Sequence, residues 1–160
     1  MSGKSPGNMS KDFEELFAFF NARNVRALIV GGYAFAYHAR PRYTKDIDVW
    51  IEATPENARR LLEALNDFGF GSLDLSVEDF TKPGQIVQLG FPPSRIDLLT
   101  SIKGLTFEEA WESHIEDLFG ETKVCYLGRD DLIRSKKAAG RAQDQVDVEV
   151  LESFREDQDS

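Results

Sequence analysis

The chain has one cysteine, Cys125, and no apolar run long enough to span a membrane. A single cysteine excludes an internal disulfide and fits a reducing compartment. The N-terminus also lacks the apolar segment of a signal peptide, so we expect a cytoplasmic protein without a membrane anchor. The two histidines, His38 and His114, are too isolated in the sequence to predict a zinc site, and a packed or surface histidine is the expectation for each.

Basic residues are scarce as well. The chain carries 19 Lys and Arg against 28 Asp and Glu, a net charge of −9. This balance excludes general binding of duplex DNA, which needs a basic face. The charge is uneven, however, because Arg40, Arg42 and Lys45 surround an Asp-Ile-Asp, and residues 129–141 hold five basic residues against two acidic ones. A local anionic ligand such as a triphosphate therefore remains compatible with the sequence.

Length and composition favour one globular domain. The 160 residues are 41% hydrophobic and 29% charged, and twelve phenylalanines supply much of the expected core. The first ten residues are rich in Gly, Ser and Pro. We therefore expect a disordered tail over residues 1–9 and a single domain over residues 10–155.

Helical and strand patterns alternate along the chain. Helices are predicted from the cap Ser10 to about Arg23, directly after Gly31-Gly32, from Thr54-Pro55 to Gly69, over 107–114, and over 129–154 as two helices or one interrupted near Gly140. A short capped turn is predicted over 76–80. Strands are predicted over 25–30, 46–52, 85–91, 94–100 and 122–128. This order predicts an α/β or α+β fold with a mixed β-sheet and helices packed on it.

Three aspartates are predicted to share one patch of that sheet. Asp46 and Asp48 project from the same face of their strand, and Asp97 projects from the later one. If the two strands are neighbours, the carboxylates converge and repel one another unless a cation lies between them. Mg²⁺ prefers a few carboxylates together with phosphate oxygens. A lone Asp-x-Asp is more often a solvated strand end, so the ordered set carries the prediction.

The glycine pair Gly31-Gly32 lies between a strand and a helix. Glycine lets the backbone approach a ligand closely, and the N-terminus of a helix favours phosphate. The alternative is an ordinary strand-to-helix turn. Together with the aspartates, the pair predicts a site where metal ions lie between the carboxylates and nucleotide phosphates lie between the metals and the glycines.

These motifs resemble a known group. Gly-Gly, thirteen intervening residues, Asp-Ile-Asp and a later Ile-Asp-Leu are similar to the signature of the nucleotidyltransferase superfamily with the polymerase-beta-like palm fold. The strings H-A-R-P-R-Y-T-K-D-I-D-V-W-I and L-I-R-S-K-K-A-A-G-R-A-Q-D-Q-V-D resemble small bacterial proteins of the AbiEii-toxin and minimal nucleotidyltransferase type. The resemblance covers about residues 26–52, 95–100 and 129–151.

The resemblance implies roles for particular residues. Three would bind Mg²⁺ or Mn²⁺: Asp46, Asp48 and Asp97. Asp97 would also be a candidate base for the acceptor hydroxyl. Five would contact the nucleoside triphosphate: Gly31, Gly32, Arg42, Thr44 and Lys136. Gly32 stands where the wider superfamily commonly has serine. For Lys136 the alternative is a solvated face of its helix, and Asp144 and Asp147 are expected to pair with Arg141 or its neighbours.

The predicted function is Mg²⁺-dependent transfer of a nucleoside monophosphate from an NTP to a hydroxyl, with release of pyrophosphate. The acceptor stays open among a protein, an RNA and a small molecule. The resemblance alone implies a toxin–antitoxin or phage-defence role. Two alternatives remain: a catalytically inert binding or regulatory protein of the same fold, and an antibiotic-modifying enzyme of the aminoglycoside or lincosamide kind.

Overall fold

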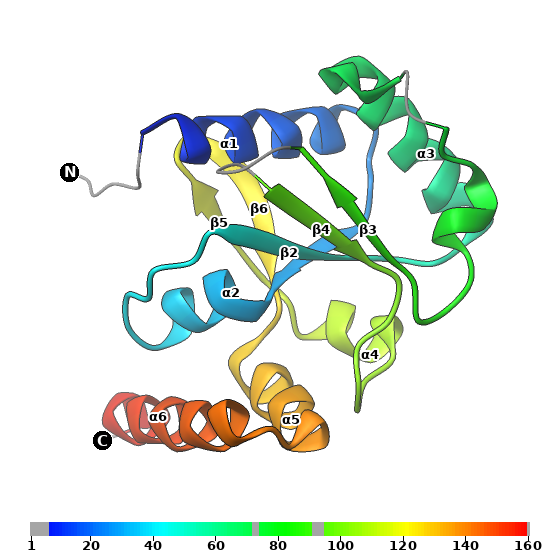
Figure 1. Ribbon diagram of the computed structural model, residues 1–160. Coiled ribbons are helices and arrows are strands. Elements are labelled where there is room, and N and C mark those ends of the chain that lie inside the picture. The colour runs from blue at the N-terminus through cyan, green and yellow to red at the C-terminus, as the bar shows by residue number, and fades with distance from the viewer. Residues whose placement is uncertain (1–6, 72–73, 91–94, 160) are drawn as a thin grey trace.

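A six-stranded mixed sheet between two layers of helices forms the molecule (Figure 1). The computed structural model describes residues 7–71, 74–90 and 95–159. The helices are α1 (Gly7–Ala22), α2 (Gly31–His38), α3 (Pro55–Leu65), α4 (Phe107–Glu112), α5 (Arg129–Ala139) and α6 (Ala142–Asp159), with short turns at Asn66–Phe70 and Val77–Phe80. The strands are β1 (Ala27–Val30), β2 (Asp46–Ile51), β3 (Ile86–Leu89), β4 (Arg95–Leu99), β5 (Ile115–Phe119) and β6 (Thr122–Tyr126).

The strand order is β3-β4-β2-β1-β6-β5, and it confirms the predicted mixed sheet. β2 runs parallel to β4 and antiparallel to β1, while β1 runs parallel to β6. The two edge strands, β3 and β5, are antiparallel to their neighbours. The predicted neighbouring strands over 85–91 and 94–100 are therefore adjacent, and β4 also lies against β2.

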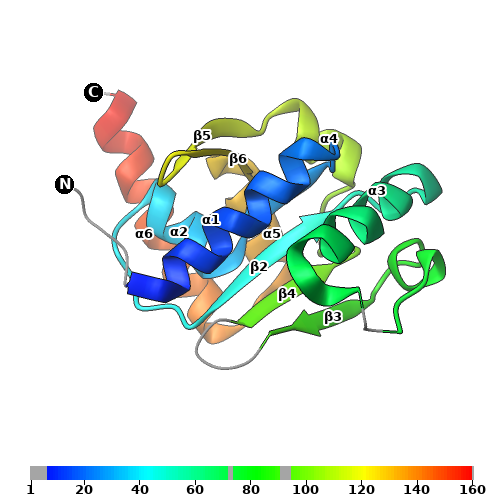
Figure 2. The same ribbon diagram turned by 90° about the horizontal axis from the view of Figure 1, so that it is seen from above.

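Each face of the sheet has its own apolar core. α1 and α3 cover one face of the sheet (Figure 2). There, four apolar residues of α1 are buried against Ile47 and Val49 of β2: Phe13, Leu16, Phe17 and Phe20. α2, α4, α5 and α6 lie on the other face (Figure 1). There a second core contains Phe35 of α2 and Trp50 of β2, both almost completely buried.

The structure corrects two expectations at the level of secondary structure. The first helix begins at Gly7, so Ser10 lies inside it and does not cap it. Residues 1–6 of the expected tail lie outside the described residues, whereas residues 7–9 are helical. β5 was not predicted from the sequence, because four of its five residues are exposed and its apolar residues do not alternate with polar ones. Gly140, with a φ of +68°, separates α5 from α6 and confirms the break predicted there.

No helix in the described part of the chain is both long enough and apolar enough to cross a membrane.

Asn57 joins α3 to the sheet from a buried position. Its side-chain amide donates hydrogen bonds to the carbonyls of Arg26 and Glu52, at 3.1 and 3.0 Å, and its Oδ1 accepts one from the Arg26 N–H at 2.8 Å. The side chain of Asn57 thereby satisfies backbone groups on the segments before β1 and after β2. Without the Asn57 side chain, the backbone groups of Arg26 and Glu52 would lose these hydrogen bonds.

We predict that Asn57→Ala lowers the free energy of unfolding by about 1–3 kcal/mol, because it removes the three hydrogen bonds of a buried side chain to backbone groups of Arg26 and Glu52. Urea denaturation measures this change. Gln145→Ala, on the exposed side of α6, is the matched control and should change the same quantity by less than about 0.5 kcal/mol. Equal effects of the two substitutions would contradict the assignment.

Candidate active site

Asp48 and Asp97 face each other across two parallel strands. Residue 48 of β2 is in register with residue 97 of β4. Alternate residues of both strands, among them Ile47 and Ile96, are buried beneath α1 and α3. The aspartates consequently lie on the opposite face, the one that α2, α5 and α6 cover. Convergence of these two carboxylates was predicted from the sequence.

The close approach of Asp97 disfavours a charge on Asp48. Burial, and then the charge of Asp97 and a carboxyl–carboxylate hydrogen bond with it, raise the pKa of Asp48 to about 6. Asp46 adds to the effect, whereas the charge of Lys136 opposes it. The Oδ1 atoms of Asp46 and Asp97 are buried, and no N–H or O–H group of the described residues donates a hydrogen bond to either. Carboxylate oxygens without hydrogen-bond donors, next to an aspartate whose pKa is raised, fit a site for a divalent cation.

Asp46 stands beside this pair, in register with Arg95 of β4. Its Oδ1 lies 4.0 Å from the Nε atom of Arg95. Within the described residues, the three aspartates do not bring one oxygen each to within 4.8 Å of one another. Asp48 and Asp97 are thus the tight pair, and like-charge repulsion is a sufficient reason for Asp46 to lie apart when no cation is bound.

Gly31 is packed against Asp48, and Gly32 is packed against Thr44. Gly31 has a φ of +66°, and a Cβ at this position would lie 2.4 Å from Asp48 Oδ2. A Cβ at Gly32 would lie 2.8 Å from the hydroxyl oxygen of Thr44. A serine at position 32 would therefore require the Thr44 side chain to shift. The Thr44 hydroxyl donates to the carbonyl of Arg42 at 3.3 Å.

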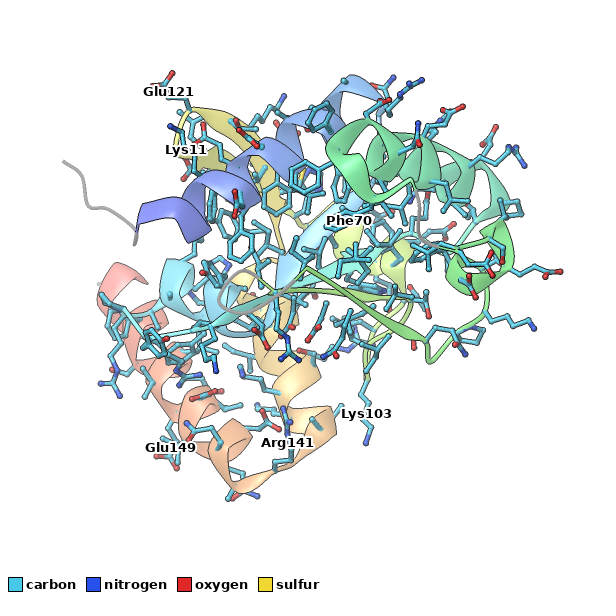
Figure 3. The ribbon with its side chains drawn as sticks, turned by 45° about the horizontal axis from the view of Figure 1, so that its top comes forward. Lys11, Phe70, Lys103, Glu121, Arg141 and Glu149 are labelled. Carbon is cyan, nitrogen blue, oxygen red and sulfur yellow. The ribbon has the colours of Figure 1, made fainter. Side chains whose placement is uncertain are left out.

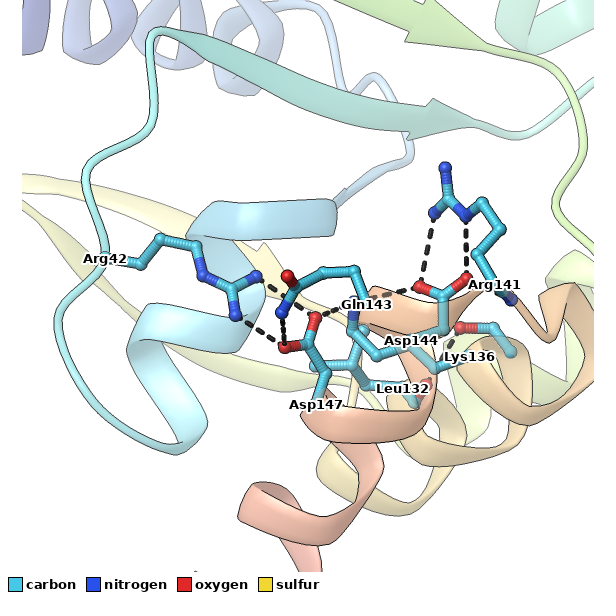
Figure 4. A network of polar contacts seen from close by, with 8 residues as sticks. Arg42, Leu132, Lys136, Arg141, Gln143, Asp144 and Asp147 are labelled. Carbon is cyan, nitrogen blue, oxygen red and sulfur yellow. Dashed lines mark hydrogen bonds and ion pairs between the residues drawn. The ribbon is translucent and has the colours of Figure 1, made fainter.

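Asp147 of α6 gathers both of the predicted phosphate-binding cations (Figure 4). Its carboxylate is 1% exposed and accepts two hydrogen bonds from the guanidinium of Arg42, at 2.5 and 3.1 Å. Lys136 of α5 and Gln143 donate to it as well, each at 2.9 Å. The Arg42 guanidinium also lies over the ring of Phe35, 3.9 Å from its centroid. Burial alone would raise the pKa of Asp147, but these donors outweigh it and hold that pKa well below its usual range.

Lys136 lies at the aspartate site rather than in solvent. Its side chain is 11% exposed, and together with Gly31 and Asp48 it lines a cleft of about 190 Å³. Ile133, one turn earlier, is buried as predicted. Lys137 is mostly exposed and pairs with Glu152 on the surface, 3.4 Å away. The structure thus places Lys136 of the two lysines beside the aspartates, although Asp147 already holds its ammonium.

The same cleft contains residues that the sequence analysis missed. Lys103, Ser135 and Arg141 line it, and Figure 3 shows Lys103 and Arg141 on the side of the molecule below the sheet. Arg141 pairs with Asp144 at 2.7 Å, which confirms the expected partner of that aspartate. The hydrogen bonds between Arg42 and Asp147 could not be predicted from the sequence, because 105 residues separate the two side chains.

His38 is a packed histidine, as expected. Its Nε2 lies 2.7 Å from the carbonyl oxygen of Leu127, and burial lowers its pKa.

Comparison with known proteins identifies the family of the chain. The model of the family described as "Nucleotidyltransferase of unknown function (DUF6036)" matches residues 8–154. No curated protein sequence matches the chain significantly.

Solved structures of nucleotidyltransferases have a similar fold. A putative nucleotidyltransferase from Thermotoga maritima is 14% identical, with a TM-score of 0.59 over 93% of this chain and 91% of that one. The antibiotic-resistance factor ANT(2'')-Ia is 13% identical, with a TM-score of 0.57 over 89% and 81%. The lincomycin-bound lincosamide antibiotic adenylyltransferase LnuA is 14% identical, with a TM-score of 0.53 over 90% and 96%. At such identities the likeness concerns the fold alone.

We predict that Asp48→Asn stabilises the metal-free protein at neutral pH. The unfolded carboxyl ionises near pH 4, whereas the folded one has a pKa of about 6. Between these values the unfolded state releases its proton first, so wild-type stability falls as the pH rises and stays lower above the folded pKa. One pKa unit is worth about 1.4 kcal/mol. Because Asp48 is partly exposed, we expect a gain of about 1–2 kcal/mol.

Thermal denaturation with a chelator, at about pH 8 and about pH 4, measures this difference. The advantage of the Asp48→Asn protein should shrink to about 0.4 kcal/mol at the lower pH, where the folded carboxyl is protonated and the unfolded one is about half protonated. Glu149→Gln, at an exposed carboxylate of α6, should leave the pH profile as it is. A less stable Asp48→Asn protein at pH 8 would show that the carboxylate is not held at a cost.

The ion pair with Asp147 also predicts that Lys136→Ala is destabilising. It removes one charged donor from a buried carboxylate, and we expect a loss of about 1–3 kcal/mol. Lys137→Ala removes only a surface pair and should change stability by less than about 1 kcal/mol. Urea denaturation of both proteins decides the point, and an unaffected Lys136→Ala protein would contradict the network.

Proposed function

Because the chain belongs to the nucleotidyltransferase family of unknown function DUF6036, we propose that it transfers a nucleoside monophosphate from an NTP to a hydroxyl acceptor, releases pyrophosphate, and depends on Mg²⁺ or Mn²⁺. The observation that carries this proposal is the register of Asp48 with Asp97, next to a glycine that packs on Asp48. Two facing carboxylates, one of which has a buried oxygen without a hydrogen-bond donor, suit a cation better than a packed interior.

The residues present fit the metal. Asp46, Asp48 and Asp97 offer carboxylate oxygens, the donors that Mg²⁺ prefers, and two of these oxygens are buried without a partner. When bound, Mg²⁺ supplies positive charge that activates the acceptor hydroxyl and neutralises the phosphates.

The protein's own groups would hold the triphosphate. Gly31 and Gly32 open α2, where free backbone N–H groups favour an anion. Lys136 lies across the cleft from Gly31 and carries a charge that phosphate oxygens can share with Asp147. Arg42 and Thr44 belong to the segment before β2 and keep it against α2 through Phe35 and Gly32. We propose that these residues position the phosphates over Asp48 and Asp97.

In the proposed reaction the oxygen of the acceptor hydroxyl forms a bond to the α-phosphorus of the NTP. The bond from that phosphorus to the oxygen bridging the β-phosphorus breaks, and pyrophosphate leaves with the electron pair. Asp97 accepts the proton of the hydroxyl. Catalysis then depends mainly on how well these groups are positioned and on charge neutralisation.

The acceptor is the open part of the proposal. A protein, an RNA and a small molecule all offer a hydroxyl, and the described cleft does not select among them. The AbiEii-like subtype and the toxin–antitoxin or phage-defence role stay predictions from the resemblance. A catalytically inert protein of this fold would gain nothing from the repulsion between Asp48 and Asp97, so the pair favours the enzyme over the inert alternative.

We predict that the wild-type protein transfers label from an α-labelled NTP, and that Asp97→Asn reduces the rate by on the order of 10²–10⁴-fold. Each of the four NTPs is incubated with Mg²⁺ and, in separate reactions, with cell proteins, RNA and hydroxylated antibiotics. Glu149→Gln is the control carboxylate and should transfer at the wild-type rate. Circular dichroism verifies that each variant is folded.

Two results would count against the enzyme. Unchanged transfer by Asp97→Asn would place the chemistry elsewhere. NTP binding by the wild type, with no transfer from any NTP to any acceptor class, would favour the inert binding protein.

A further inference from the structure

A second group of potential metal ligands lies on the β5–β6 hairpin. The nitrogen, oxygen and sulfur ligand atoms of His114, Glu116 and Cys125 all lie within 4.8 Å of one another. β1 separates this hairpin from β2 and its aspartates in the strand order. The group is therefore distinct from the candidate active site. It brings a carboxylate and a thiol beside His114, which the sequence had given no reason to expect.

The hairpin places these side chains on one side. Glu116 and Cys125 are directly opposite in the antiparallel ladder of β5 and β6, so their side chains project from the same face. His114 precedes Glu116 by two residues, which is the spacing of one face of an extended chain. The sequence analysis missed the group because it missed β5, and the strand supplies the ligand that joins the histidine to the cysteine.

The ring of His114 is oriented for ligation. Its Nδ1 donates a hydrogen bond to the carbonyl of Trp111, which requires the proton on Nδ1 and leaves the Nε2 lone pair free. The ring also stacks on Trp111, with centroids 4.2 Å apart. A backbone carbonyl that fixes the second nitrogen is the usual support of a metal-bound histidine. Nε2 lies 3.5 Å from Glu116 Oε2, with which it forms an ion pair when the ring is protonated, and this distance is close to the spacing of about 3.3–3.8 Å between ligands of a tetrahedral zinc ion.

Two cations, Arg26 and Lys123, line the same cleft as Glu116 and Cys125. Lys123 lies 3.3 Å from the other carboxylate oxygen of Glu116, Oε1. Arg26 lies over the Trp111 ring, 5.0 Å from its centroid, and pairs with Glu52 at 3.6 Å. Glu116 and Cys125 also border a cleft of about 430 Å³, which leaves room for a fourth ligand from solvent.

We propose that His114, Glu116 and Cys125 form a zinc site with one coordination position open to the cleft. Imidazole is a borderline ligand and thiolate a soft one, and both suit Zn²⁺ and not Mg²⁺, while the carboxylate is a hard ligand that Zn²⁺ also accepts. Binding replaces the thiol proton of Cys125 with the metal and releases that proton to solvent. The ion would tie the segment after α4 to both strands of the hairpin.

Cobalt titration of the full chain tests the site, because Co²⁺ occupies zinc sites and reports a thiolate ligand by its charge-transfer absorption. We expect one Co²⁺ per chain with this band, displaced by Zn²⁺, and slower alkylation of Cys125 with Zn²⁺ bound. Cys125 is the chain's only thiol, so both signals report this position. Cys125→Ser should abolish the band. His114→Gln and Glu116→Gln should each weaken binding at least as much as loss of an outer-shell partner does, about 10–100-fold.

Matched variants separate this site from the aspartates. Glu121→Gln changes an exposed carboxylate at the turn of the same hairpin and should bind Co²⁺ like the wild type. Asp48→Asn should also keep the charge-transfer band. A Co²⁺ complex without the band, unchanged binding by Cys125→Ser, or alkylation of Cys125 that Zn²⁺ does not slow would overturn the proposal. Circular dichroism checks each fold, and a misfolded His114→Gln protein leaves the decision to the other two variants.

Discussion

The opposition of Asp48 and Asp97 across β2 and β4 is the constraint on which the rest of the site depends. Two carboxylates in register are unfavourable in a partly buried position unless a cation compensates them. The buried faces of both strands, anchored by Ile47 and Ile96 in the core under α1 and α3, prevent the strands from slipping. A slip of one residue would turn these apolar side chains to the cleft side and move the carboxylates into the core under α1 and α3. The core therefore enforces a local repulsion that a metal site can use.

A second charge arrangement holds the opposite wall of the cleft. Asp147 is buried on α6 and draws Arg42 and Lys136 together, although these two cations come from segments far apart in sequence. The three positive or polar donors outweigh the cost of burying one carboxylate, which is why its pKa falls below the usual range. α6 contributes to the cleft in two ways, because Asp144 lines it and Asp147 holds Lys136 beside Asp48. The C-terminal helix is in this way part of the candidate active site.

Local patterns were sufficient for most of the fold and for the aspartates. Period-two alternation placed Asp46 and Asp48 on one face, and the Thr54 cap and Gly140 marked helix ends that the structure has. β5 could not be predicted, because a strand at the sheet edge needs no apolar face and four of its residues are exposed. The partners of Asp147 could not be predicted either, since they depend on how α6 packs against the segment before β2. The roles of Gly31, Gly32, Arg42, Thr44 and Lys136 toward a nucleotide stay predictions.

Ligand chemistry separates the two candidate metal sites of this sheet. The aspartate site offers only oxygen donors that carry negative charge, and it adds a lysine and helix-opening glycines that suit phosphate. The hairpin site offers one nitrogen, one oxygen and one sulfur. A hard ion that keeps part of its water shell is favoured at the first and a borderline ion at the second. Since β1 lies between the hairpin and β2, each set of ligands can select its ion without competing for the other's residues.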